Sequence, residues 1–319
     1  MIYLRAMHPP RSAAGEHTRR PGVSSAGTVG RGILAGSVVE SSQGIDPGSR
    51  SAPVPAVVAD YVIVRLLGEG NHGRYFLARP PARLDLPDEF VALKVFGDPV
   101  GEQGYERGVR ELRAFAAVAS PYLVRVFDAV LDDSFAYAMQ YFPCGSLASP
   151  SRPVTRPEVL TALEHAARAA HALHEAGLAH GDIKPANVLL ANDGGGRLSD
   201  LGLARVLSPG ATLTGMGRAS SVEYMDPQLM AGERPSRRTE VFALGATVHR
   251  VLAGTGLYGE LPDTQPLLAI RRVMSSKPEV SPVLSAAEAE LVRACIADDD
   301  TRLPSALAVA ERIAALVAG

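Results

Sequence analysis

The chain contains 319 residues, of which 46% are hydrophobic, and carries a formal net charge of −2, which suits one large domain or two lobes. The near-neutral charge gives no electrostatic reason to expect nucleic acid as a partner, and no run of about 18 apolar residues favours membrane insertion. The N-terminus lacks the apolar core of a secretory signal and the two cysteines fit no disulfide framework, so we expect a cytoplasmic protein.

Residues 1–58 show no sustained apolar period and are rich in Ser, Gly, Pro, Ala and Arg. A segment of this composition cannot bury enough apolar surface to offset the entropy that it would lose on ordering. We therefore expect a disordered tail over residues 1–58, followed by a folded domain over residues 59–317.

The first part of the folded domain, about residues 59–143, is rich in predicted strands. A β-branched run leads through a glycine-rich turn into a second apolar run, which is the pattern of a β-hairpin. A later segment has the apolar spacing of an amphipathic helix. The predicted elements, in chain order, are strands at 61–67, 74–79 and 90–96, a helix at 104–119, and strands within 122–133 and 134–142.

The second part, about residues 144–317, is mainly helical. A Thr-Arg-Pro-Glu capping box at 155–158 predicts the start of a helix that continues to about residue 175. Apolar residues recur at helical spacing from Val241 to Leu252 and indicate a buried central helix. Two further helices are predicted, around 286–297 and 304–317. The predicted fold class is therefore α+β, with a small antiparallel sheet lobe that contains one helix and a larger helical lobe.

The glycine-rich turn contains Gly68, Gly70 and Gly73 in a Gly-x-Gly-x-x-Gly spacing. The same spacing marks a dinucleotide site when a helix follows, but here a strand follows. Glycine lets backbone N–H groups approach phosphates without a Cβ in the way. The motif alone is compatible with a nucleotide phosphate site and with a plain hairpin turn.

Only three of the 32 basic residues are lysines, namely Lys94, Lys184 and Lys277. Where arginine fills the other basic positions, a lysine indicates a need for a compact ammonium charge. Lys94 lies on an apolar predicted strand, where it is costly to bury without a partner, and Glu111 on the next helix is the natural candidate. The alternative is a lysine that extends to solvent from an edge strand.

The segment HGDIKPANVLL holds Asp182 and Asn187 five residues apart with Lys184 between them, and Asp200 follows in an Asp-Leu-Gly sequence. Phosphoryl transfer concentrates negative charge, so it requires an oxygen-ligated metal, fixed cations and an aligned nucleophile. Asn187 and Asp200 offer oxygen ligands, and the lysines offer cations. Each residue alone could be a turn former, but their joint order and spacing favour the catalytic interpretation.

With these motifs, the chain from about Tyr61 to Leu316 resembles the eukaryotic-like Ser/Thr protein kinases of bacteria. The resemblance implies that Asp182 orients the substrate hydroxyl and accepts its proton, and that Lys184 contacts the γ-phosphate of ATP. It implies that Asn187 and Asp200 hold Mg²⁺, with Mn²⁺ as the alternative metal. The other positions that it implies for catalysis or ATP binding are Lys94, Glu111, Gly68, Gly70, Gly73, Ala92, Met139, Gln140, Phe142 and Leu189.

Within that set, Met139 matches the gatekeeper, and Gln140 and Phe142 belong to the hinge that pairs with adenine. Ala92 and Leu189 match the apolar residues on the two faces of the base. The resemblance further implies protein substrates that carry Ser or Thr, autophosphorylation, and a kinase homodimer as one arrangement for phosphorylation between copies.

Several positions depart from the family pattern. Gly181 replaces the arginine that pairs with a phosphate on the activation segment, so we expect no need for that switch. Gln228 replaces the glutamate whose salt bridge to Arg302 anchors the segment, and a neutral amide would bind Arg302 more weakly. Glu240 stands where an aspartate tethers the catalytic loop, and Tyr75 stands where a valine covers the adenine.

Four hydroxyl residues of the activation segment are candidate autophosphorylation sites: Thr212, Thr214, Ser220 and Ser221. Ser221 also stands where a threonine steadies the catalytic aspartate and lysine. Three histidines of one predicted helix have no third ligand nearby, so we expect surface or interfacial histidines rather than a metal site: His165, His171 and His174. We expect His180 to pack and to bond the backbone of the catalytic loop.

Three functions remain open at this point. An active Ser/Thr protein kinase agrees with Lys184, with Asp-Leu-Gly, and with residues 220–228, which resemble a shelf for an extended peptide. The His-Gly-Asp sequence with Asn187 also resembles the loop of the aminoglycoside kinases, which act on small molecules. An ATP-binding pseudokinase scaffold is the third hypothesis, kept open by the departures at Gln228 and Glu240. The substrate and the activating signal do not follow from the sequence.

Overall fold

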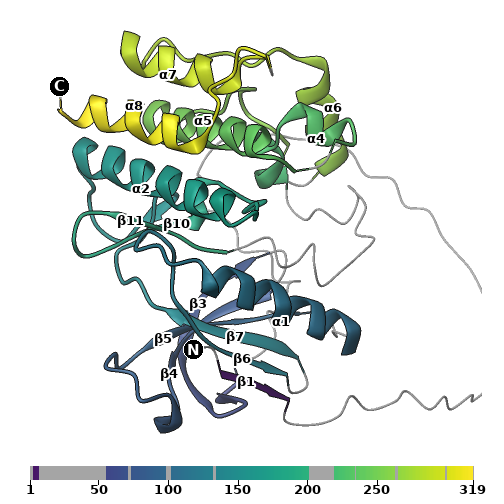
Figure 1. Ribbon diagram of the computed structural model, residues 1–319, viewed down its shortest axis with the longest axis vertical. Coiled ribbons are helices and arrows are strands. Elements are labelled where there is room, and N and C mark those ends of the chain that lie inside the picture. Colours follow the sequence, from purple (N-terminus) through teal and green to yellow (C-terminus); the bar gives the residue numbers. More distant parts are fainter. Residues whose placement is uncertain are drawn as a thin grey trace, which may run out of the picture.

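The computed structural model describes residues 3–6, 55–70, 73–97, 102–131, 134–200, 219–233, 235–262, 265–298 and 300–318. Figure 1 shows two lobes: a curved β-sheet with the single helix α1 beside it, and a bundle of helices stacked above it. The first lobe holds the elements up to β7, and the second lobe holds the elements from α2 onward. The expected two-lobed α+β fold is confirmed.

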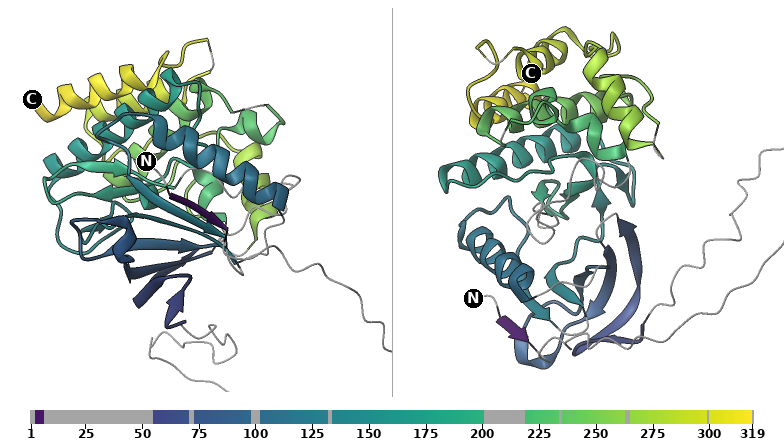
Figure 2. Two further views of the ribbon diagram at one scale, coloured as in Figure 1. Left: turned by 60° about the horizontal axis from the view of Figure 1, so that its bottom comes forward. Right: turned by 90° about the vertical axis from the view of Figure 1, so that its right-hand side faces the viewer.

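The sheet of the small lobe has the strand order β1-β6-β7-β5-β4-β3-β2. Its pairs from β2 to β6 are all antiparallel, and β3 and β4 form the predicted hairpin. Gly70 and Gly73 pair at the end of that hairpin, whose two long strands lie side by side in Figure 2. The main strands are β3 (Tyr61–Gly70), β4 (Gly73–Arg79), β5 (Val91–Val95), β6 (Val126–Leu131) and β7 (Phe135–Gln140).

Side chains of these strands alternate between two apolar clusters, because successive residues of a strand point to opposite faces. On β7, Tyr137 and Met139 belong to the cluster that includes Leu112 of helix α1 (Glu102–Ala117), whereas Ala136 and Ala138 belong to the opposite cluster. Strand β5 follows the same rule, since Ala92 lies on the α1 side and Leu93 on the other. The alternation places the even-numbered residues of β5, Lys94 among them, toward the inter-lobe face.

The N-terminal tail is not wholly irregular. Strand β1 (Tyr3–Ala6) pairs in parallel with the edge strand β6, and β2 (Val57–Val58) pairs with the start of β3. The expectation of disorder over residues 1–58 is therefore wrong for these two segments, because an unpaired sheet edge can order even a short strand through backbone hydrogen bonds. Residues 7–54 of the expected tail lie outside the described residues.

The large lobe is built on the predicted helices α2 (Arg156–Glu175), α5 (Arg237–Ala253), α7 (Ala286–Ile296) and α8 (Ala306–Ala318). Thr155 and Glu158 form the expected reciprocal capping box of α2. Helix α5 is the expected central helix, with every residue from Thr239 to His249 buried. A similar capping box at Ser236 starts α5, and Gly254 ends it in the left-handed conformation.

The large lobe also contains several short elements that were not predicted from the sequence. Helices α4 (Pro227–Met230) and α6 (Pro266–Ser275) each carry a proline in the first turn. A second sheet, ordered β11-β10-β8-β9, lies under α2 next to the small lobe. Its strands are β8 (Gly145–Ser146), β9 (Ser149–Pro150), β10 (Val188–Leu190) and β11 (Gly196–Leu198).

This second sheet positions the chemistry of the protein. The segment HGDIKPAN runs from the end of α2 into β10, and it includes the short helix η2 (Pro185–Asn187). Asp200 follows β11, which pairs antiparallel with β10. The two segments therefore end side by side at the boundary between the lobes. Within the described part of the chain, we find no helix that is both long and apolar enough to cross a bilayer.

Candidate active site

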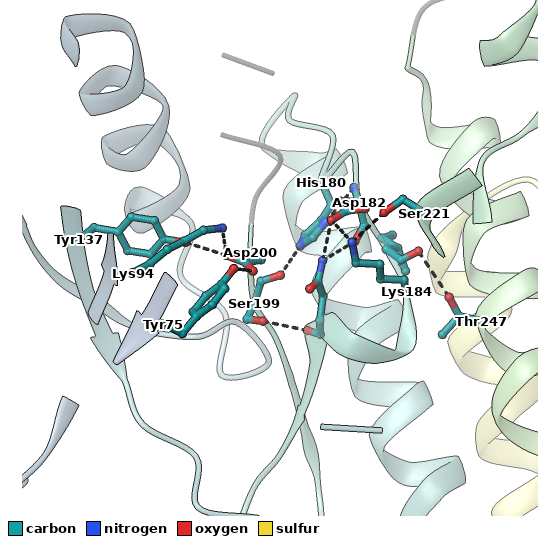
Figure 3. A network of polar contacts seen from close by, with 12 residues as sticks. Tyr75, Lys94, Tyr137, His180, Asp182, Lys184, Ser199, Asp200, Ser221 and Thr247 are labelled. Atoms are coloured by element: carbon teal, nitrogen blue, oxygen red, sulfur yellow. Dashed lines mark hydrogen bonds and ion pairs between the residues drawn. The ribbon is translucent and has the colours of Figure 1, made fainter. Parts of the chain in front are cut away.

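Two backbone contacts hold the segment 180–187 against the residues that precede Asp200. The Ser199 amide donates to the carbonyl oxygen of Asn187 at 2.8 Å, and His180 Nε2 donates to the carbonyl oxygen of Ser199 at 2.8 Å. His180 is fully buried, and this burial lowers the pKa of its imidazole. The prediction of a packing and backbone-bonding role for His180 is confirmed. Figure 3 shows Asp182 and Asp200 on the two sides of this junction.

Asp182 has a fixed orientation in the loop. Asn187 Nδ2 donates to the Asp182 carbonyl oxygen at 2.7 Å and to Asp182 Oδ2 at 3.0 Å. Lys184 Nζ lies 2.7 Å from the same Oδ2 and donates to Ser221 Oγ at 2.9 Å. Ser221 thus contacts the lysine as the resemblance predicted. Since the amide nitrogen of Asn187 is committed to Asp182, its amide oxygen is the atom that can coordinate a metal.

A buried network tethers this loop to the central helix. The Gly181 amide donates to Glu240 Oε1 at 2.5 Å, and His174 Nε2 lies 2.6 Å from Glu240 Oε2. Burial opposes ionisation of Glu240, but the hydrogen bonds from His174 and Gly181 and the nearby His180 outweigh it, so the pKa of Glu240 is lowered. The longer glutamate therefore still reaches the loop. Of the two alternatives expected for His174, the surface and an interface, the structure shows the second, because His174 of α2 is buried against Glu240 of α5.

Gly181 adopts a left-handed backbone conformation, with φ +82°. A residue with a Cβ is strained there, although no atom would obstruct that Cβ. The glycine in place of arginine therefore relieves backbone strain at the residue before Asp182, which the sequence pattern alone did not indicate.

Lys94 reaches across the lobe boundary to Asp200. Lys94 Nζ lies 2.7 Å from Asp200 Oδ1, which also accepts the hydroxyl of Tyr137 at 2.8 Å. The hydroxyl of Tyr75 donates to Asp200 Oδ2. Burial alone would raise the pKa of Asp200, but the Lys94 charge and these hydrogen bonds outweigh it and lower that pKa. The predicted partner Glu111 lies on α1, and its side chain is outside the described residues. The Lys94–Glu111 pair stays a prediction.

The hydrogen bond from Tyr137 to Asp200 was not predicted from the sequence. Tyr137 lies two residues before Met139, so strand alternation places both side chains on the same face as Lys94. The ammonium of Lys94 lies 5.0 Å from the ring centroid of Tyr75 and 5.9 Å from that of Tyr137. The position of Tyr137 opposite Lys94 in the strand pairing was the feature that could have indicated this contact. Tyr75 was recognised as a departure from the pattern but not as a partner of Asp200.

The three glycines of the hairpin turn differ in what requires them. Gly73 has φ +143°, and a Cβ there would lie 2.1 Å from the Val95 carbonyl oxygen, so only glycine fits. Gly68 has open space where a Cβ would lie. Gly70 pairs with Gly73 at the end of the hairpin, and the two residues between them lie outside the described residues.

The residues assigned to adenine binding share one apolar cluster between the lobes. Ala92, Met139 and Phe142 are buried in it, and Leu189 packs against it from the second sheet. The Gln140 amide donates to the Arg125 carbonyl oxygen at 2.9 Å, which fixes the start of the hinge. The structure brings these positions together around one region, while the pairing of the hinge with adenine stays a prediction.

The salt bridge that anchors the segment containing Asp226 and Gln228 is not the one expected from the sequence. Arg302 pairs with Asp226 Oδ2 rather than with Gln228, and it also donates to the carbonyl oxygens of Ala297 and Arg238 at 3.0 Å each. Asp226 Oδ1 accepts the amide of Gln228 at 3.0 Å and so caps α4. The expectation that a neutral amide at Gln228 weakens this anchor is wrong, because a carboxylate two residues earlier supplies the charge.

Other expected positions contribute less. Thr212 and Thr214 lie outside the described residues, as does the side chain of Ser220. Among the described residues, no group of three or more His, Cys, Asp or Glu side chains could hold a metal. A divalent cation in a nucleotide site uses only one or two protein oxygen ligands, together with phosphates and water. The carboxylate of Asp200 and the amide oxygen of Asn187 are oxygen atoms of the kind that could hold such a cation.

Comparison with known proteins agrees with this geometry. Residues 61–312 match the protein kinase domain family. The chain is 32% identical over 260 residues to the serine/threonine-protein kinase PknJ of Mycobacterium tuberculosis, covering 77% of this chain and 43% of PknJ. It is 31% identical over 213 residues to the DNA damage-responsive serine/threonine-protein kinase RqkA of Deinococcus radiodurans, covering 64% of this chain and 31% of RqkA.

A third relative is the serine/threonine-protein kinase PknF of Mycobacterium tuberculosis, 33% identical over 234 residues, with 69% of this chain and 48% of PknF covered. The match thus spans less than half the length of each of these relatives. The family match covers most of the present chain and includes every catalytic position described above. The chain belongs to the protein kinase family, and these three bacterial relatives are serine/threonine-protein kinases.

Proposed function

We propose that this chain is an active kinase that transfers the γ-phosphate of Mg²⁺-bound ATP to Ser or Thr hydroxyls of protein substrates, and that it also phosphorylates itself. The observation that carries this proposal is the convergence of Asp182, Asn187 and Asp200 with Lys94 and Lys184 at one junction of the two lobes. A nucleophile-orienting carboxylate, metal ligands and fixed cations are the groups that phosphoryl transfer requires.

Each residue has a distinct part in this mechanism. Asp182 orients the substrate hydroxyl and takes its proton, while Lys184, 2.7 Å from Asp182, counters the charge that develops on the transferred group. Asn187 and Asp200 would hold Mg²⁺, which neutralises phosphate charge when bound. Lys94 would bind the α and β phosphates, with Glu111 as its partner in the nucleotide-bound state. The glycines of the hairpin turn would let its backbone N–H groups approach the phosphates.

A protein substrate is favoured over a small molecule by the contact between Lys184 and Ser221. This contact connects the catalytic loop to the segment 219–228, whose capped helix α4 is held by the buried pair of Asp226 and Arg302. A shelf fixed in this way beside Asp182 suits an extended peptide. It also weighs against the pseudokinase hypothesis, because the departure at Gln228 is compensated.

Further features of the whole protein belong to the same proposal. We propose a cytoplasmic kinase domain over residues 59–317, an adenine site at Ala92, Met139, the hinge and Leu189, and phosphorylation between two copies of the chain. The lack of an arginine at Gly181 supports a catalytic loop that is ordered without a phosphate on the activation segment.

The proposal is tested by incubating the purified full chain with ATP and Mg²⁺ and mapping phosphosites by mass spectrometry. Wild-type protein should gain phosphate on Ser or Thr, in itself or in a generic basic protein, and Asp182→Asn should abolish the gain. Asp88→Asn is the matched control, because it makes the same change at an exposed carboxylate that is not among the residues assigned to the site. Equal incorporation in wild type and Asp182→Asn would refute the proposal. Aminocyclitol acceptors in a parallel assay test the small-molecule alternative.

A further inference from the structure

Three side chains of the small lobe donate hydrogen bonds to the carboxylate of Asp200. Oδ1 accepts from both Lys94 and Tyr137, at 2.7 and 2.8 Å, and Oδ2 accepts the hydroxyl of Tyr75. A carboxylate offers about four acceptor positions, so three of them are taken in this arrangement. Figure 3 shows the two phenol rings converging on Asp200 from the small lobe.

The two oxygens of Asp200 are not equivalent toward a metal ion. Oδ1 is held by the ammonium of Lys94 and by a hydroxyl, and a cation placed there would meet the Lys94 charge directly. Oδ2 has no cationic partner among the described residues and accepts only the neutral hydroxyl of Tyr75. Oδ2 is therefore the oxygen of Asp200 that could hold a metal ion, and it is the oxygen that the Tyr75 hydroxyl contacts.

The backbone explains why Tyr75 can reach this atom. Tyr75 lies on β4 directly opposite Lys94 on β5, so both side chains leave the sheet on the same face. The Tyr75 side chain extends from β4 in the small lobe to Asp200, which follows β11 in the large lobe.

We propose that Tyr75 is a latch on the metal ligand: in the nucleotide-free protein its hydroxyl occupies Asp200 Oδ2, and it must release that oxygen when a metal–nucleotide complex binds. This inference rests on the proposed function and deepens it, because it makes Tyr75 a positioning residue that sets the affinity for the metal-bound nucleotide. Tyr137 donates to Oδ1, beside Lys94, and so holds the carboxylate through the oxygen that Tyr75 does not contact.

The energetic consequence follows from linkage. A ligand that binds only the released state has an apparent affinity reduced by the small fraction of protein in that state. A hydrogen bond between a hydroxyl and a carboxylate is strong enough for its removal to raise the affinity about tenfold. Tyr75→Phe keeps the ring and its packing but removes the donor, so it isolates this bond.

The test is calorimetric titration of ADP into the full chain with excess Mg²⁺ and, separately, with EDTA. Tyr75→Phe should bind Mg²⁺-ADP about tenfold more tightly than wild type, with a much smaller gain in EDTA. Tyr137→Phe should gain less than Tyr75→Phe, because the Tyr137 hydroxyl lies on Oδ1 and not on Oδ2. Tyr258→Phe is the matched control, since it removes a buried hydroxyl of the large lobe that has no partner in the described structure.

The possible outcomes separate the latch from the function on which it rests. Unchanged or weaker Mg²⁺-ADP binding by Tyr75→Phe, with phosphoryl transfer intact, overturns the latch and leaves the kinase proposal in place. An equal gain in Mg²⁺ and in EDTA also overturns it, because Tyr75 would then exclude the nucleotide rather than the metal. If neither wild type nor Tyr75→Phe binds Mg²⁺-ADP or transfers phosphate, the ATP site itself is refuted.

Discussion

The buried pair of Asp226 and Arg302 gives the sharpest prediction for stability. Arg302 is 6% exposed and Asp226 is 1% exposed, so Asp226→Ala would leave a buried guanidinium without a carboxylate. Breaking such a pair costs about 3–5 kcal/mol, and the two backbone carbonyls that Arg302 retains place the loss near about 3 kcal/mol. Loss of the α4 cap adds about 1 kcal/mol.

We therefore expect Asp226→Ala to lower the free energy of unfolding by about 4 kcal/mol, or the Tm by about 10 °C in a domain of this size. Asp226→Asn keeps a cap and a neutral hydrogen bond to Arg302, so it should lose about half as much. Urea unfolding followed by circular dichroism measures these differences, with Asp88→Asn as the exposed control.

Because Asp226 supplies the charge that Gln228 lacks, a second substitution should restore part of the stability that Asp226→Ala loses. Adding Gln228→Glu to Asp226→Ala returns a carboxylate to the neighbourhood of Arg302 and should recover about half of the lost stability, whereas Gln228→Glu alone should add little, because Arg302 already has its partner. A loss below about 1 kcal/mol for Asp226→Ala, or no recovery in the double variant, would refute the reasoning.

Three further changes test individual contacts. Gly73→Ala should lower the free energy of unfolding in urea titrations, because its Cβ would lie 2.1 Å from the Val95 carbonyl oxygen, while Gly68→Ala, with open space for a Cβ, should be as stable as wild type; equal stability of the two variants would contradict the assigned packing. Gly181→Ala should lower the free energy of unfolding by about 1 kcal/mol in urea titrations because φ is +82°, and an unchanged value would argue against that conformation. Glu240→Gln should lower stability at neutral pH. Because the folded pKa of Glu240 is depressed, its ionised form stabilises the fold above the ordinary pKa of 4.5 and loses that effect as the pH falls through the folded pKa, so the stability difference from wild type, measured by unfolding at several pH values, should shrink in acid; a constant difference would contradict this.

Most of the fold could be predicted from local sequence patterns. The capping box at Thr155, the apolar period of α5 and the hairpin of β3 and β4 depend on residues close in sequence, so the sequence alone predicts them. The catalytic loop was predicted for the same reason, since Asp182 and Asn187 lie within one short segment. Helices α4 and α6 were missed because each is short and ends without a strong signal.

Contacts between distant segments could not be read from the sequence in this way. Two residues of one segment, Asp226 and Gln228, could each bind the Arg302 side chain. Only the folded backbone decides that Asp226 faces Arg302. The contacts of Asp200 with Tyr75 and Tyr137 join three strands of two lobes. Strand β1 is a similar case, because its order depends on the free edge of β6 and not on its own composition.

The central claim is that side chains from both lobes converge on one metal-bound nucleotide, and a crystal structure of the full chain with Mg²⁺ and a non-hydrolysable ATP analogue tests it most directly. We predict Mg²⁺ at about 2.1 Å from Asp200 Oδ2 and from the amide oxygen of Asn187, with Lys94 Nζ against the phosphates and Tyr75 released from Asp200. A nucleotide bound elsewhere, or Asn187 and Asp200 directed into separate regions, would contradict the account.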